Sequence, residues 1–170
     1  SQQSASYQFQ TIISARSILK MVITLLNTNQ TMVRDSIIYG LSCVNINIYK
    51  ILLETISTLR TAWEYEVQQK MINNGNARLK IEVSHVLAST SKYISDKSIY
   101  TDEWILQELV SFIKTLINFL LMEKVQEDYE YQKLRRYFCV LLENFYLGLK
   151  KSVDHQDLLS FEARVSCFQF

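Results

Sequence analysis

Residues 31–45 read TMVRDSIIYGLSCVN, and the spacing of their apolar side chains indicates an α-helix. These side chains recur mostly at steps of three and four, so they fall on one side of a helix: Val33, Ile37, Ile38, Leu41 and Val44. Such a helix belongs either to a compact bundle, whose interior can hold a pocket, or to one unit of a stacked repeat, which offers a surface.

The same periodicity continues along almost the whole chain and predicts an all-α protein. Helices are expected up to residue 27 and over 31–44, 48–63, 77–94, 104–124, 127–151 and 160–170, with polar interruptions at 27–31, 45–47, 71–77, 95–103 and 153–160. Shorter and longer helices alternate roughly, which favours stacked helix pairs over a compact bundle. We expect residues 1–170 to form one helical-repeat segment of about three antiparallel helix pairs, with a loop near 71–77.

The composition supports long helices and excludes several classes of function. The chain has 48% hydrophobic residues, no proline and only three glycines, so it is poor in the residues that tight turns of β-proteins need. The net charge of +1 disfavours a nucleic-acid or anionic-membrane partner. The longest apolar stretch, 104–122, contains Glu108 and Lys114 and is a poor membrane span. No signal peptide is recognisable in SQQSASYQFQ, so we expect a cytoplasmic protein.

Cysteine and histidine residues are sparse and far apart. Cys43, Cys139 and Cys167 are expected to be small buried hydrophobes rather than disulfide or zinc ligands. His85 is expected to be a partly buried histidine, although EVSH (82–85) has the Glu-x-x-His spacing of a di-metal bundle once. His155 lies among carboxylates in a linker. No phosphate-binding loop or placed catalytic group is recognisable, so we expect a non-enzymatic chain without cofactor or metal.

The opening stretch has the pattern of the first helix of a HEAT-type repeat. Val33 and Arg34 stand near the helix start, and Gly40 precedes Leu41 near its end. In this interpretation, Gly40 allows close helix packing, and Arg34 pairs with an acidic group of the neighbouring repeat. Two further local features are expected: left-handed backbone at Gly75, which would end the preceding helix, and an N-cap at Thr101.

Longer stretches resemble the Furry family of large cell-morphogenesis proteins. The similar segments occur in collinear order over residues 31–170: VRDSIIYGLSCVNINIYKILLETISTLR (33–60), LKIEVSHVLASTSKYI (79–94), LRRYFCVLLENFYLGL (134–149) and LLSFEARVSCFQF (158–170). Asn45 of the family's turn is retained, but the usual proline position holds another residue. The segment 67–80 has few basic residues where family members are arginine-rich, which puts a basic contact surface there in doubt. The last pattern runs to Phe170 without a helix stop, so a fragment of a longer protein is expected.

This resemblance implies a HEAT/armadillo-like α-solenoid that serves as a scaffold. The implied partners are an NDR-class kinase with its Mob co-activator, in the RAM network, together with the rest of the chain's own solenoid. The implied process is polarised growth and cell morphogenesis, with enrichment at sites of polarised growth. The alternative is a compact helical bundle that acts as a generic protein-interaction module in a different pathway.

One basic and aromatic cluster is the candidate interaction site. It comprises Lys133, Arg135, Arg136 and Tyr137, within a stretch that follows the acidic sequence EDYEYQ. Basic and aromatic side chains together are enriched at protein interfaces and suit an acidic partner. The competing interpretation is an ordinary solvated helix face with pairing between successive turns.

Overall fold

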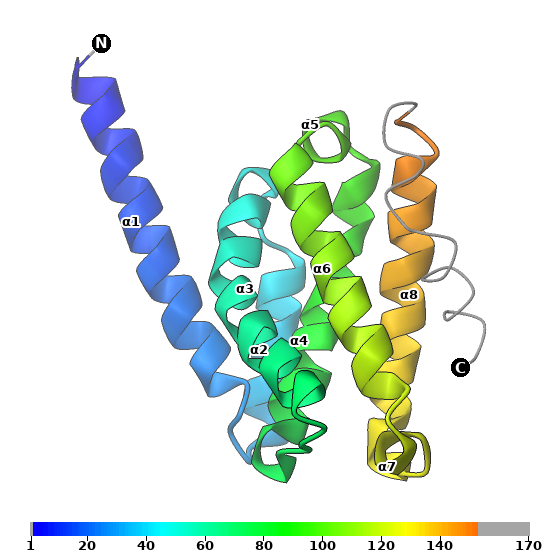
Figure 1. Ribbon diagram of the computed structural model, residues 1–170. Coiled ribbons are helices and arrows are strands. Elements are labelled where there is room, and N and C mark those ends of the chain that lie inside the picture. Colours follow the sequence, from blue (N-terminus) through cyan, green and yellow to red (C-terminus); the bar gives the residue numbers. More distant parts are fainter. Residues whose placement is uncertain (1, 153–170) are drawn as a thin grey trace.

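A computed structural model describes the backbone of residues 2–152 and the side chains from Ser14 onward, apart from that of Asn74 (Figure 1). The described residues form helices and contain no strand, which confirms the all-α prediction. The helices are α1 (Gln2–Leu25), α2 (Thr31–Ser42), α3 (Ile46–Gln68), α4 (Ala77–Thr90), α5 (Lys97–Tyr100), α6 (Glu103–Leu120), α7 (Glu123–Gln126) and α8 (Gln132–Leu149). Short 3₁₀ turns are η1 (Asn74–Asn76), η2 (Ser91–Ser95) and η3 (Tyr129–Tyr131). The expected helix over 160–170 lies outside the described residues.

The six longer helices form two rows. In one row α3 lies between α1 and α6, and in the other α4 lies between α2 and α8. Successive long helices therefore alternate between the rows, and the stack extends across Figure 1 from α1 to α8. This arrangement is consistent with an α-solenoid, in which each unit packs on its neighbours. The HEAT/armadillo type of the repeat stays a prediction.

Several helix starts are set by polar side chains. Asn45 accepts a hydrogen bond from the backbone N–H of Asn47 (2.9 Å) at the start of α3. At α6 the cap is Asp102, which accepts from the N–H of Ile105 (3.1 Å), so the predicted cap at Thr101 is wrong by one residue. The carboxylate is the better cap because it also complements the positive end of the helix dipole.

The end of α3 differs from the sequence prediction. No described glycine has a positive φ, and Gly75 lies in η1; the left-handed residue is Lys70, with φ 51°. The N–H of Met71 donates to the carbonyl of Glu66 (2.9 Å), and that of Lys70 donates to Val67 (3.0 Å). These two bonds are the Schellman pattern that satisfies the last carbonyls of a helix. A lysine therefore occupies the position that glycine usually takes.

The close-packed glycine is Gly148, and the prediction for Gly40 is wrong. A Cβ at Gly40 would meet nothing within 4 Å, because Gly40 lies on the exposed side of α2. A Cβ at Gly148 would lie 2.8 Å from the carbonyl oxygen of Ile94 and closer still to its Cγ2. Gly148 thus allows α8 to approach the η2 backbone.

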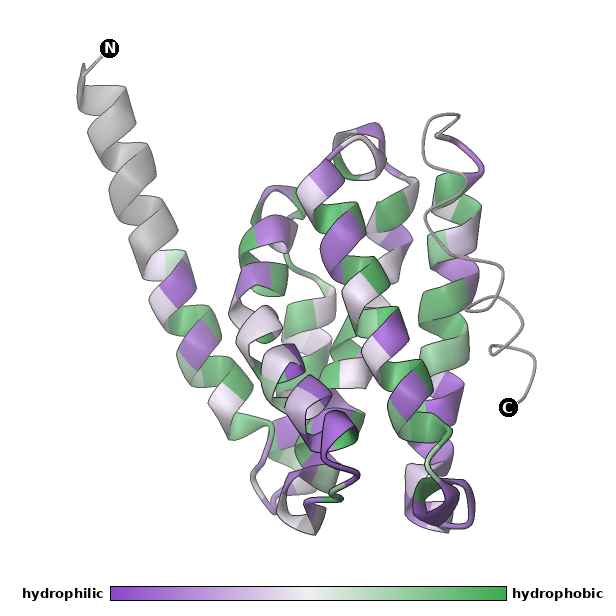
Figure 2. Ribbon diagram, viewed as in Figure 1, coloured by the Kyte–Doolittle hydropathy of each residue, from purple (hydrophilic) through white to green (hydrophobic). Residues whose placement is uncertain are grey.

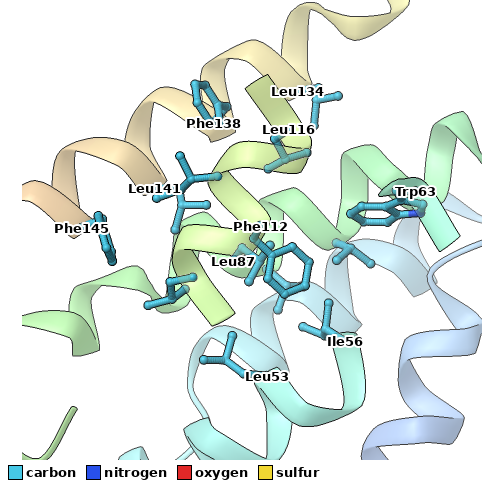
Figure 3. Packing of buried hydrophobic residues seen from close by; sticks show 14 of the residues in the cluster. Leu53, Ile56, Trp63, Leu87, Phe112, Leu116, Leu134, Phe138, Leu141 and Phe145 are labelled. Atoms are coloured by element: carbon cyan, nitrogen blue, oxygen red, sulfur yellow. The ribbon is translucent and has the colours of Figure 1, made fainter. Parts of the chain in front are cut away.

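The core lies between the rows. Figure 3 shows Phe138, Leu141 and Phe145 pointing from α8 toward the neighbouring helices, and all three side chains are buried. Trp63 of α3 meets Phe112 of α6 edge to face, with ring centroids 6.3 Å apart. Hydrophilic residues instead dominate the connecting segments at the lower end of Figure 2. None of the described helices has the length and apolar character needed to cross a membrane.

Ion pairs join neighbouring helices within each row. Arg60 of α3 binds Glu108 of α6 (2.7 Å), and Arg34 of α2 binds Glu82 of α4 (3.2 Å). Arg16 of α1 pairs similarly with Glu54 of α3. In each pair the arginine belongs to the earlier helix and the glutamate to the next helix of the same row. These pairs help set the register of successive units.

Candidate interaction surface

The four predicted site residues all lie on α8, but they have different roles. Lys133 and Arg136 are exposed, whereas Arg135 and Tyr137 are partly buried. Successive residues of a helix point about 100° apart, so these four cannot form one continuous patch. Their part in binding a partner stays a prediction.

Arg135 is used within the fold. Its guanidinium donates to the carbonyl of Val125 (2.5 Å), to that of Gln126 (2.9 Å) and, at 3.4 Å, to that of Asp128. These carbonyls belong to the end of α7 and the turn after it, where those of Val125 and Asp128 accept only long backbone hydrogen bonds of 3.3 Å. Arg135 therefore joins the start of α8 to the α7 turn, and its charge is committed to that contact.

Tyr137 lies against His85 of α4. The two rings stack with centroids 4.2 Å apart and an interplanar angle of 7°. His85 is partly buried, as predicted. Burial lowers the pKa of His85 below 6.5, and the nearby carboxylates of Glu82 and Asp35 oppose that effect. Burial also raises the pKa of Tyr137. Burial of His85 thus favours its neutral imidazole near pH 7.

Arg34 of α2 contacts α4 on the side away from α8. Besides the ion pair with Glu82, it donates to the carbonyl of Thr28 (2.8 Å), which also accepts from Arg78 (3.4 Å). Arg34 therefore fastens the 27–31 turn and α2 to the next helix pair. This confirms the prediction that Arg34 pairs with an acidic group of the neighbouring unit.

Together these residues form a polar surface over one row, which we call the α2–α4–α8 face. It comprises Asp35, the Arg34–Glu82 pair, His85, Tyr137, Lys133 and Arg136. The exposed carboxylate of Asp35 is at the α2 side, and the exposed cations Lys133 and Arg136 are at the α8 side. Asp35, Lys133 and Arg136 all lie close enough to His85 to affect the pKa of its imidazole.

The histidine, cysteine and glutamate residues that could bind a metal or act in catalysis do not form a common site among the described residues. Glu82 of the EVSH motif is bound to Arg34, and the described residues contain no group of three His, Cys, Asp or Glu side chains placed to hold a metal. Cys43 and Cys139 are exposed free thiols, so the expectation that they are buried is wrong. Cys43 follows the end of α2, and Cys139 lies on the outer side of α8. Cys167 and His155 lie outside the described residues.

One buried ion pair was not predicted from the sequence. Lys80 of α4 is 1% exposed, and its Nζ lies 2.5 Å from Glu66 Oε2 of α3. The ammonium also lies 5.2 Å from the ring centroid of Phe119 and 5.8 Å from that of Trp63. A signal was present, because Lys80 precedes Val83 and Leu87 by three and seven residues on the apolar side of the helix.

Comparison with known proteins gives two relatives. The whole chain is 41% identical to part of cell morphogenesis protein PAG1 of Saccharomyces cerevisiae. Cell polarity protein mor2 of Schizosaccharomyces pombe matches 93% of the chain at 28% identity. The chain spans only 7% and 8% of the length of these two proteins. No family model matches the chain, and no solved structure matches it.

Proposed function

We infer that the chain is a short segment of a Furry-family cell-morphogenesis protein, as its sequence predicted. On that premise we propose that it is a non-enzymatic scaffold segment. Its relatives are named for cell morphogenesis and cell polarity, which supports a role in morphogenesis. The finer proposal is that the segment supports signalling by an NDR-class kinase and its Mob co-activator in polarised growth. We further propose a cytoplasmic location with enrichment at growth sites.

The observation that carries this proposal is the two-row stack with a polar face across three helices. The α2–α4–α8 face presents partly buried aromatic and imidazole rings beside exposed cations. Such a mixture of flat rings and cations is typical of protein interfaces. Lys133 and Arg136 are the proposed contacts with acidic groups of the kinase–Mob complex, and Arg135 supports α8 from within.

Co-purification of the kinase–Mob complex with the full-length protein tests this proposal. The variant reverses both exposed cations, Lys133→Glu with Arg136→Glu, and leaves Arg135 intact so that the α7 contact is kept. A matched control, Lys20→Glu with Lys97→Glu, reverses two exposed lysines on α1 and α5.

We expect the wild type and the control to retain the complex and the α8 variant to lose most of it. If the wild-type protein fails to retain the complex, the kinase–Mob assignment is wrong. If the α8 variant retains as much as the control, the α2–α4–α8 face is not the contact.

A further inference from the structure

His85 is the histidine of the described part of the chain, and charged groups from three helices lie around it. They are Asp35 and the Arg34–Glu82 pair on the α2 side, and Lys133 and Arg136 on the α8 side. Imidazole is the side chain whose charge ordinarily changes between about pH 5 and pH 8. His85 is therefore the group that changes the net charge of the α2–α4–α8 face near neutral pH.

The stack with Tyr137 holds the imidazole close to the two cations of α8. The rings of His85 and Tyr137 lie nearly parallel, with centroids 4.2 Å apart. Lys133 precedes Tyr137 by four residues, so the two side chains lie on the same side of α8. Arg136 is adjacent to Tyr137 in the sequence, and both cations act on the imidazole. A partner carboxylate that binds these cations would also approach His85.

The carboxylates already near His85 do not hold a proton on it. Glu82 is bound to Arg34 at 3.2 Å, and Asp35 is exposed, so water and salt screen its charge. Burial of the imidazole outweighs both carboxylates and keeps the pKa of His85 below 6.5, and the cations of α8 lower it further. Without a partner, the face therefore presents a neutral imidazole beside two cations near pH 7.

His85 gains a proton without losing its stacking partner. The face of an aromatic ring attracts a cation, and the interplanar angle of 7° keeps the imidazole parallel to the ring of Tyr137. His85 is only partly buried, so the imidazole keeps access to water. Protonation thus changes the charge of the face and leaves the packing of α4 on α8 in place.

We propose that His85 takes up a proton when an acidic group of the partner binds beside Lys133 and Arg136. A carboxylate within about 6 Å favours the charged imidazole. By linkage, the protonated face must bind that carboxylate more tightly than the neutral face does. The contact should therefore strengthen as the pH falls from about 7.5 to about 6.0. This inference rests on the proposed function, because it needs an acidic partner on the α2–α4–α8 face.

The test measures the affinity of the full-length protein for the kinase–Mob complex at about pH 7.5 and at about pH 6.0. It compares the wild type with His85→Gln and with the matched control His155→Gln, which removes the other histidine of the sequence. Glutamine is polar and does not titrate. The readout is the ratio of the two affinities, because lost packing lowers both affinities and titrating groups of the complex contribute equally to all three proteins.

We expect the gain in affinity on acidification to be about threefold larger for the wild type than for His85→Gln. His155→Gln should match the wild type. Titration calorimetry near pH 6.5, in two buffers with different ionisation enthalpies, counts the protons taken up on binding. The wild type should take up more protons than His85→Gln, a difference that a merely structural histidine would not produce.

An equal affinity ratio in the wild type and His85→Gln would overturn the proposal, and so would an equal loss of the ratio in His155→Gln. If the wild-type protein does not bind the complex at either pH, the kinase–Mob assignment is wrong and this inference falls with it. Loss of binding and loss of the pH dependence are separate results, so the two failures are distinguishable.

Discussion

Lys80 Nζ lies 2.5 Å from Glu66 Oε2 and joins the two rows of helices from inside the stack. The contact crosses from α4 to α3, whereas the arginine–glutamate pairs join helices within a row. The side chain of Lys80 is 2% exposed and that of Glu66 is 13% exposed, so neither charge is well hydrated. Each charge therefore depends on the other. The rings of Trp63 and Phe119 also stabilise the Lys80 ammonium, and Asn76 donates a hydrogen bond to Glu66 Oε1 (3.3 Å).

Removing the lysine charge should destabilise the fold strongly. Lys80→Met keeps most of the side-chain volume but leaves Glu66 without its ammonium partner, which costs about 3 kcal/mol of unfolding free energy. Urea unfolding measures the loss. Adding Glu66→Gln should recover part of it because the unpaired charge is then gone. A loss below about 1 kcal/mol in the single variant would show that water screens this pair.

Replacing Gly148 or Gly40 by alanine should change the free energy of unfolding in opposite directions. Gly148→Ala places a Cβ against the Ile94 backbone and should cost about 1–3 kcal/mol of unfolding free energy. Gly40→Ala adds a methyl group in open space on α2 and should stabilise by about 0.5–1 kcal/mol. Thermal unfolding of both variants provides the comparison, and a change of the same sign in both would contradict this packing.

His85 should make the stability of the protein depend on pH in the range around its unfolded-state pKa. Because burial lowers the pKa of His85 in the folded protein, the unfolded chain binds more protons. The stabilisation is present above pH of about 6.5 and is lost as the pH falls below it. Urea unfolding of the wild type and His85→Gln across this range isolates the effect. The difference between them should shrink on acidification, and a constant difference would exclude this role.

Arg135 should matter for local stability more than its neighbour. Arg135→Met removes the hydrogen bonds to the α7 carbonyls and should cost about 1–2 kcal/mol, with faster amide hydrogen exchange in α7 and η3. Arg136→Met removes an exposed cation and should change stability by less than about 0.5 kcal/mol. Equal effects of the two changes would mean that Arg135 does not hold the turn.

Much of the architecture follows from the sequence, because helical periodicity records which side of each helix is buried. The alternation of helices predicted the stack, and the position of Arg34 predicted its ion pair with a neighbouring unit. The periodicity could not show which glycine meets a neighbour, since Gly40 and Gly148 differ only in what lies opposite them. It also could not show that Lys70 adopts left-handed backbone in place of Gly75.

The candidate surfaces were harder to predict than the fold. The sequence placed Lys133, Arg135 and Arg136 in one cluster, but the turn of the helix directs Arg135 into the α7 carbonyls. The surface hollow lined by Lys70 and Lys124 was not predicted, because these two residues are brought near each other only when the ends of α3 and α6 meet. Such a site depends on tertiary packing and has no local sequence pattern.

Hydrogen–deuterium exchange of the full-length protein, with and without the kinase–Mob complex, tests the scaffold role most directly. Slower exchange is expected on addition of the complex in peptides from α8 (Gln132–Leu149) and the facing parts of α2 and α4. Unchanged exchange throughout residues 31–149, with protection elsewhere in the full-length protein, would contradict the claim that this segment contacts the complex.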